Sequence, residues 1–211
     1  MRVMLLGATG LVGGQVLPLL LGDRRCSAVV APTRRALPAL AAGLCNPVLD
    51  FATLPQSPPW AQVDAVICAL GSTLAQAGSR DAFHRIDHDY PLAFARMALA
   101  QGARAFVLNS AAGASARSPF FYNRVKGELE DDLRGLGFPS LTLVRPGLIG
   151  GQRSEVRRGE HVAGKVLGVL GPLLPRGWRI NPAPNIAAAL VAAALAPQPG
   201  VHVVPAQALA D

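Results

Sequence analysis

Short runs of apolar, often β-branched residues alternate along the chain with longer segments whose apolar spacing suits helices. The runs in DAVICAL and RAFVLNS have unbroken apolar centres, which is typical of strands buried on both faces of a parallel sheet. This pattern predicts an α/β fold with a doubly wound, Rossmann-like parallel sheet covered by helices. The predicted strands lie at 2–6, 28–31, 46–49, 63–69, 104–108, 140–144 and 201–204.

The composition agrees with a compact chain, because 51% of the residues are hydrophobic and only 16% are charged. The apolar stretches at 162–174 and 186–196 are interrupted or too short to cross a bilayer, so they predict buried helices and no membrane partner. The net charge of +7 would suit an anionic ligand. The arginines are scattered, however, and aromatic residues make up only 5%, so we predict no nucleic-acid partner.

The three cysteines, Cys26, Cys45 and Cys68, lie far apart and form no CxxC pair. They predict neither a disulfide framework nor a zinc site, and they fit a reducing compartment. The N-terminus runs from Met1 into an apolar strand without a small-residue cleavage site, which is not typical of a secretory signal. We therefore expect a cytoplasmic protein.

Three glycines in GATGLVG follow the first predicted strand and open a helix expected over about 11–21. The first would allow a tight turn, the second the approach of backbone N–H groups to a pyrophosphate, and the third close packing of helix on strand. A glycine-rich turn without a ligand is the alternative, but the strand before and the helix after favour a dinucleotide site. The residues that this loop would supply are Gly7, Thr9, Gly10, Leu11, Val12 and Gly13.

The end of the second predicted strand carries no acidic residue for the ribose 2′-hydroxyl of NAD. It carries Arg34 and Arg35, which could bind a 2′-phosphate through charge-assisted hydrogen bonds and so favour NADP over NAD. Two surface arginines that only solvate a loop are the alternative. Asp50, at the end of the third predicted strand, could accept a hydrogen bond from the adenine amino group.

A second group of residues suggests catalysis. Tyr122 and Lys126 are four apart on a predicted helix and so share a face. The lysine ammonium would favour the phenolate and could hold the nicotinamide ribose, so the tyrosine could exchange a proton with a carbonyl or alcohol. Ser110, at a strand end, could hydrogen-bond the substrate oxygen, with Ser115 as the alternative.

With these motifs the chain resembles the short-chain dehydrogenase/reductase superfamily, in its atypical NAD(P)H-binding branch that includes the human Tat-interacting-protein-like oxidoreductase and bacterial relatives. The resemblance rests on GATGLVG, DAVICALGSTLAQAGS, RIDHDY, YNRVKGELE and LVRPGLIGG. It implies that Ala69, Leu70 and Gly71 lie along the cofactor and that Pro146 sits near the nicotinamide. Asn109 departs from the pattern, because relatives often carry a second serine before Ser110.

The segment HRIDHDY places His84 and His88 four apart on a predicted helix, with Asp87 between them, a spacing compatible with metal binding. Hydride transfer needs no metal, and the sequence offers no evident third ligand. We therefore predict no metal site and assign these side chains to contacts at a helix end or to solvation.

The 211 residues show no linker or repeat and predict one nucleotide-binding domain, with a small substrate-side cap at about 151–182. The cap's arginines could meet an acidic substrate or face water, and we favour water. Two functions remain open: an NADPH-dependent oxidoreductase acting on a carbonyl or quinone-like small molecule, and an NADPH-binding redox sensor that regulates a protein partner. The serine, tyrosine and lysine favour the enzyme. The chain is expected to be a monomer or a homodimer.

Overall fold

The computed structural model describes residues 1–38, 41–150 and 180–210. Its central feature is a seven-stranded sheet in the order β3-β2-β1-β4-β5-β6-β9, in which every neighbouring pair is parallel. A second, two-stranded sheet pairs β7 with β8. The strands are β1 (Arg2–Leu6), β2 (Ala28–Val30), β3 (Leu44–Cys45), β4 (Ala65–Cys68), β5 (Ala105–Asn109), β6 (Ser140–Arg145), β7 (Ile149–Gly150), β8 (Asn181–Pro182) and β9 (Gly200–Pro205).

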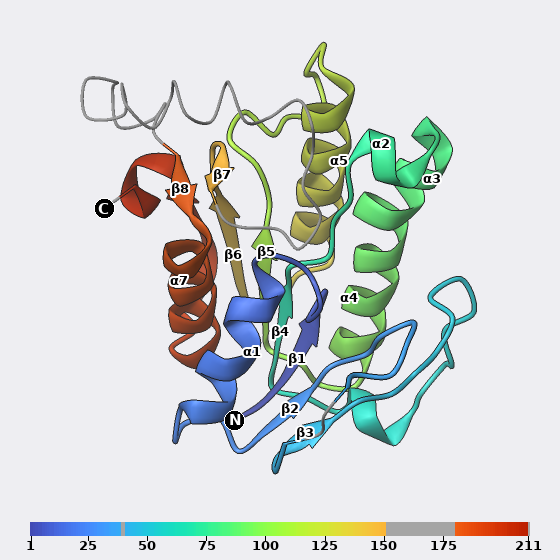
Figure 1. Cartoon of the computed structure of the whole chain (residues 1–211), viewed down its shortest axis with the longest axis vertical. Helices are drawn as coiled ribbons and strands as arrows, with labels where there is room; N and C mark the ends of the chain where they lie inside the picture. The colour runs from blue at the N-terminus through green and yellow to red at the C-terminus, as the bar shows by residue number, and fades with distance from the viewer. Residues whose placement is uncertain (39–40, 151–179, 211) are drawn as a thin grey trace.

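Helices cover both faces of the large sheet (Figure 1). The helices α1 and α7 lie on one side, and α4 and α5 lie on the other. This is the doubly wound arrangement that the sequence predicts, in a single domain. The helices are α1 (Gly13–Gly22), α2 (Leu74–Ala77), α3 (Arg80–His84), α4 (Tyr90–Ala100), α5 (Phe121–Gly135) and α7 (Ala183–Leu195), with a π-helix η2 (Arg85–Asp89) and 3-10 turns η1 (Pro59–Ala61) and η5 (Ala206–Leu209).

Alternate residues of each central strand feed two separate core layers. In β1, Val3 and Leu5 pack toward α1 and α7, whereas Met4 and Leu6 pack toward α4 and α5, and all four are fully buried. Burial on both faces explains why the strands have unbroken apolar centres. The apolar residues of α7 complete the first layer, so the predicted buried helix at 186–196 is confirmed.

The third strand differs from the sequence prediction. It is only Leu44–Cys45, while the predicted run at 46–49 makes one isolated bridge, between Val48 and Thr33. Pro47 has no backbone N–H, so it cannot donate the hydrogen bond that would extend the pairing of β3 with β2. The side chain of Asn46 donates to Ala31 O instead, at 2.7 Å. The predicted cap at 151–182 lies outside the described residues except for its last three.

The order of strands reverses between β1 and β4, so the carboxyl ends of these two strands open a crevice where α/β proteins bind ligands.

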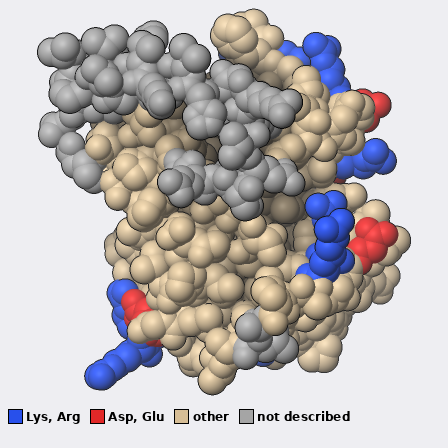
Figure 2. Space-filling view, in the orientation of Figure 1, with Lys and Arg blue, Asp and Glu red and all other residues tan. Residues whose placement is uncertain are grey.

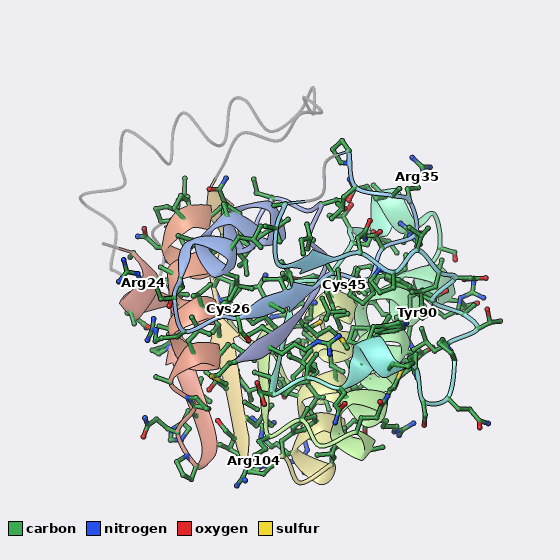
Figure 3. All side chains as sticks on the ribbon, turned by 90° about the horizontal axis from the view of Figure 1, so that it is seen from below. Arg24, Cys26, Arg35, Cys45, Tyr90 and Arg104 are labelled. Atoms are coloured by element: carbon green, nitrogen blue, oxygen red, sulfur yellow. The ribbon has the colours of Figure 1, made fainter. Side chains whose placement is uncertain are left out.

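None of the described helices is both long and apolar enough to cross a membrane. The three cysteines are free thiols, and Cys26 and Cys45 stand apart in Figure 3. On the face shown in Figure 2, the described lysines and arginines form a few separate groups, most of them on the right and one at the lower left.

Candidate functional site

The turn after β1 can be built only from glycine at two positions. Gly7 has φ of 83°, and a Cβ there would lie 2.6 Å from Ala69 O. A Cβ on Gly13 would lie 2.0 Å from Gly7 O, so the first turn of α1 packs directly on the strand end. Gly10 is less restricted, at 3.3 Å from the same oxygen. The structure thus gives the outer two glycines the turn and packing roles that their spacing predicts.

The N-terminus of α1 is open to an anion. Val12 occupies the cap position without a side-chain hydrogen bond to the helix, and the first turn carries no acidic residue. Thr9 and Gly10 are exposed at the mouth of this turn, while Leu11 is half-buried against the core. The positive end of the helix dipole therefore has no side-chain cap and no carboxylate that would compete with a pyrophosphate.

A cavity of about 600 Å³ joins the glycine turn to the arginine pair. Both arginines are exposed, and Arg35 projects from the rim of the molecule in Figure 3. Their side chains can reach a ligand that extends from the glycine turn without first breaking an ion pair, because neither has a salt bridge among the described residues. The cavity is lined by Thr9, Thr33, Arg34, Arg35 and Ala36.

Asn46 braces the arginine loop, a role that sequence reasoning missed. Its amide donates to Thr33 Oγ1 at 2.8 Å, and its Oδ1 accepts from Leu37 N at 2.9 Å. Thr33 Oγ1 in turn donates to Arg35 O at 2.6 Å. The segment from Thr33 to Leu37, which carries both arginines, is therefore held at both ends by one side chain. The only sequence signal was an asparagine before proline, which is common in turns.

Asp50 lies five residues beyond the end of β3 and is exposed. Its Oδ1 accepts a hydrogen bond from Ala52 N at 2.9 Å, which closes a local turn. It is not among the described residues that line the cavity. The structure thus accounts for Asp50 as a turn former, and its expected contact with adenine has no support from this geometry.

The loop after β4 connects the glycine turn to a buried ion pair. Ala69 backs onto Gly7, and a Cβ on Gly71 would lie 3.6 Å from Lys126 Nζ and 3.1 Å from Asp87 Oδ1. Lys126 Nζ lies 2.9 Å from Asp87 Oδ1, as a close ion pair rather than an aligned hydrogen bond. The other oxygen of Asp87 accepts from Ser72 N at 2.7 Å. Asp87 is thus the counter-ion of Lys126, and the sequence placed it only in a histidine motif.

Burial and charge act in opposite directions on Lys126. Its removal from water disfavours the ammonium, but the neighbouring groups, the Asp87 carboxylate first among them, together more than compensate, so the pKa of Lys126 is raised above its ordinary value. Lys126 therefore remains charged over the pH range in which proteins are studied. One of its three N–H donors faces Asp87, which leaves two donors for other groups near Gly71.

Tyr122 stands one turn before Lys126 on α5. Its ring centroid lies 6.0 Å from Lys126 Nζ and 5.9 Å from the ring of Phe83. The side chain is 42% exposed, so its hydroxyl can meet a ligand. The structure thus brings the tyrosine and lysine together on one helix face, as their four-residue spacing predicts.

Ser110 is directed elsewhere. Its buried hydroxyl donates to Glu130 Oε1 at 2.5 Å. Glu130 lies eight residues beyond Tyr122, which is about 12 Å along the helix axis. The same carboxylate accepts two hydrogen bonds from Arg145 and one from Arg134. Since its proton is committed to a buried carboxylate, Ser110 has no donor left for a substrate oxygen in this geometry, which departs from its expected catalytic role.

The loop that carries Ser115 is clamped onto α5. Asn123 Nδ2 donates to Ala112 O at 2.9 Å, and a Cβ on Gly127 would lie 2.1 Å from the backbone of Ser115. These contacts give a physical reason for the asparagine and glycine of the YNRVKG segment. Ser115 itself is exposed, and its Oγ accepts from Arg117 N at 3.3 Å. Its proton is therefore not committed to a buried acceptor.

Pro146 follows β6 at the same carboxyl edge of the sheet. It is buried, and its carbonyl accepts from Ala112 N at 2.7 Å. The RPG turn thereby joins the ends of β5 and β6. Asn109, which ends β5, has a buried Oδ1 without a hydrogen-bond partner among the described residues.

Comparison with known proteins gives relatives over most of the chain. No family model matches. The chain is 36% identical to the protein fmp52, mitochondrial, of Aspergillus clavatus, covering 84% of this chain and 80% of that protein. It is also 36% identical to the protein FMP52, mitochondrial, of Candida albicans, covering 74% and 70% respectively. These names point to mitochondria and contradict the cytoplasmic location expected from the cysteines and the N-terminus.

Solved structures of similar architecture have low sequence identity. MoeE5 in complex with UDP-glucuronic acid and NAD has a TM-score of 0.72 at 16% identity, covering 96% of this chain and 75% of that one. A short-chain dehydrogenase/reductase from Saccharomyces cerevisiae has a TM-score of 0.68 at 12% identity, covering 96% and 95%. The chain therefore has the short-chain dehydrogenase/reductase fold, which confirms that part of the resemblance. Similarity to the Tat-interacting-protein-like oxidoreductases in particular stays a prediction.

Proposed function

This chain belongs to the Fmp52 family, and we propose that it is an NADP-dependent oxidoreductase that reduces a carbonyl or quinone-like small molecule. The observation that carries the proposal is the continuity of the crevice. Gly7 lies directly against the backbone of Ala69, and Gly71, two residues after Ala69, lies close to Lys126 Nζ. The loop after β4 thus runs from a dinucleotide-type glycine turn directly to a tyrosine and lysine pair with acid–base chemistry.

The residues present fit a nicotinamide dinucleotide. The turn at Gly7 and the contact at Gly13 leave no room for side chains, so the backbone N–H groups can approach a phosphate closely. Arg34 and Arg35 stand across the adjoining cavity, where an adenosine 2′-phosphate would extend. When bound, NADPH would supply the hydride for reduction.

The chain's own residues would then orient the reactants and move the proton. The two remaining N–H groups of Lys126 would bind ribose hydroxyls, with Asp87 holding the ammonium in place. Tyr122 would donate its hydroxyl proton to the carbonyl oxygen as that oxygen gains negative charge. Ser110 would anchor the end of β5 to Glu130 instead of contacting the substrate.

Replacing Arg34 and Arg35 together by alanine should weaken NADPH binding by at least about tenfold and change NADH binding little. The reason is that a hydrogen bond to a charged group contributes about 1.5–3 kcal/mol, and only NADPH carries the 2′-phosphate. Fluorescence titration with both nucleotides measures the two affinities. Arg24→Ala is the control, because this exposed arginine is not among the residues that line the cavity. Equal losses for the two nucleotides would contradict NADP selectivity.

Ser110→Ala should lower the free energy of unfolding by about 1.5–3 kcal/mol, because it removes a buried hydrogen bond to a carboxylate. Denaturant unfolding measures this change, with Ser115→Ala, at an exposed position, as the control expected to stay within about 0.5 kcal/mol. If Ser110→Ala keeps its stability and loses as much turnover as a Tyr122 variant does, Ser110 does not serve to anchor β5 to Glu130. Ser110 would then be the substrate hydrogen-bond donor.

The proposal as a whole is tested by incubating the purified protein with NADPH and a panel of aldehydes, ketones and quinones. Loss of the NADPH absorbance that depends on both protein and acceptor is the expected result. Tight NADPH binding without turnover of any panel member would count against the oxidoreductase and favour the redox sensor. Failure to bind either nucleotide would remove both functions.

A further inference from the structure

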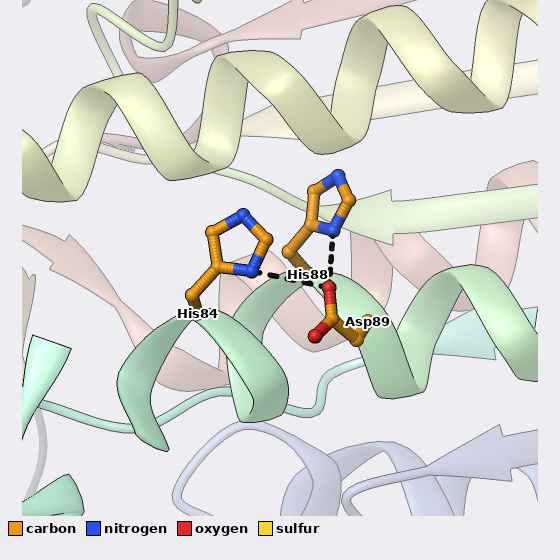
Figure 4. A group of neighbouring side chains, drawn as sticks. All are labelled: His84, His88 and Asp89. Atoms are coloured by element: carbon orange, nitrogen blue, oxygen red, sulfur yellow. Dashed lines mark hydrogen bonds and ion pairs between the residues drawn. The ribbon is translucent and has the colours of Figure 1, made fainter. Parts of the chain in front are cut away.

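Two histidines and one aspartate converge between α5 and the helical segment that leads into α4 (Figure 4). Asp89 Oδ1 lies 3.1 Å from His84 Nδ1 and 2.8 Å from His88 Nδ1. The three possible ligand atoms all lie within 4.8 Å of one another. The sequence suggested only the two histidines, so the structure supplies the third ligand that was missing.

The convergence depends on a local change of helix type. Residues Arg85–Asp89 form a π-helix between α3 and α4, and a π-helix places residues i and i+5 on nearly the same face. His84 and Asp89 are five apart, so a regular α-helix would separate their side chains by more than a quarter turn. Such short π-helical segments are often associated with functional sites.

The spacing of the three atoms suits a tetrahedral metal ion. Zinc bonds of about 2.0–2.1 Å place neighbouring ligand atoms about 3.3 Å apart. The two separations from Asp89 Oδ1 are within about half an ångström of this value. Two nitrogens and one carboxylate oxygen are also the ligand types that zinc accepts, and a water could complete the tetrahedron.

The opposite ring nitrogens already have the partners that metal-bound histidines use. His88 Nε2 lies 3.1 Å from Asp132 Oδ2, and His84 Nε2 lies 3.6 Å from Glu128 Oε2. Glu128 and Asp132 are four apart on α5 and share a face. A carboxylate behind a histidine fixes its tautomer and leaves the other nitrogen free to bind metal.

We propose that His84, His88 and Asp89 form a binding site for one Zn²⁺ ion, separate from the cofactor crevice. The site is accessible, because the side chains of His84 and Asp89 are 39% and 47% exposed. Asp87, one residue before His88 in the same π-helix, pairs with Lys126 of α5. The ion would therefore fix the helical segment that positions the Lys126 counter-ion, and it would take no part in the reaction.

Calorimetric titration of tag-free, dialysed protein with Zn²⁺ tests this site. The wild type should bind one equivalent, and its unfolding midpoint should rise with zinc concentration. His84→Ala and His88→Ala should lose this binding, whereas His202→Ala, at an exposed histidine on β9, should keep it. Wild-type protein that binds no zinc would overturn the proposal, as would unchanged affinity in both variants.

A second pair of variants separates metal binding from helix stability. Asp132→Asn should weaken Zn²⁺ binding by about 10- to 100-fold, because the carboxylate behind His88 loses its charge. Asp131→Asn is the matched control, since this exposed neighbour pairs with Arg134 and should leave the affinity unchanged. Both side chains are about half-exposed or more, so both variants should fold. Equal affinity in the two variants would exclude the proposed support of His88 by Asp132.

Discussion

Tyr122→Phe is expected to lower kcat for NADPH oxidation by about 100- to 10,000-fold while leaving the affinity for NADPH nearly unchanged. That range is the usual contribution of a positioned general acid, and the substitution removes only the proton donor. The ring remains, so its contact with Phe83 and its place beside Lys126 are kept. Because Tyr122 is exposed, the free energy of unfolding should change by no more than about 0.5 kcal/mol.

Steady-state kinetics with the best acceptor of the panel, together with nucleotide titration, measure both quantities. Tyr90→Phe is the matched control. Tyr90 is the other tyrosine of the chain, and its ring, at the start of α4, packs against the ring of Phe51. Its kcat should stay close to that of the wild type. Undiminished turnover in Tyr122→Phe would contradict the proposed mechanism, and a parallel loss of NADPH affinity would assign the tyrosine to binding.

The sequence predicted the parts of the fold that depend on local patterns. The runs around Val66 and Val107 identified central strands because both faces of such strands are buried. The third strand was misplaced because it lies at an edge, where few apolar neighbours mark its position. There the register depends on Pro47 and on the side-chain bonds of Asn46, which no periodic pattern reports.

The candidate site was predictable where its residues are close in sequence. Tyr122 and Lys126 share a helix turn, and the glycines share a single loop, so their spacing carries the geometry. Contacts between distant segments carried no such signal. The pairing of Asp87 with Lys126, and of Ser110 with Glu130, depends on how α5 packs against the preceding elements. For this reason the counter-ion was missed and the serine was expected to face the substrate.

The ion pair of Asp87 and Lys126 should have the largest effect on stability. Both side chains are buried, so removing one charge leaves the other without compensation in a medium of low dielectric constant. Asp87→Asn should therefore lower the free energy of unfolding by about 3–5 kcal/mol. The asparagine can still accept the hydrogen bond from Ser72 N, so the loss of stability measures the missing charge and not a missing hydrogen bond to the loop after β4.

Lys126→Met should cost a similar amount, because it leaves the Asp87 carboxylate buried and unpaired. The double variant Asp87→Asn with Lys126→Met should be more stable than the sum of the two losses predicts, since no uncompensated charge remains. Denaturant unfolding of all four proteins gives the coupling free energy, and strictly additive losses would show that the two charges are not paired. The double variant should nevertheless lack turnover. That result would mean that the ion pair serves to keep an ammonium beside Tyr122. Apolar residues at the same two positions could stabilise the fold equally well.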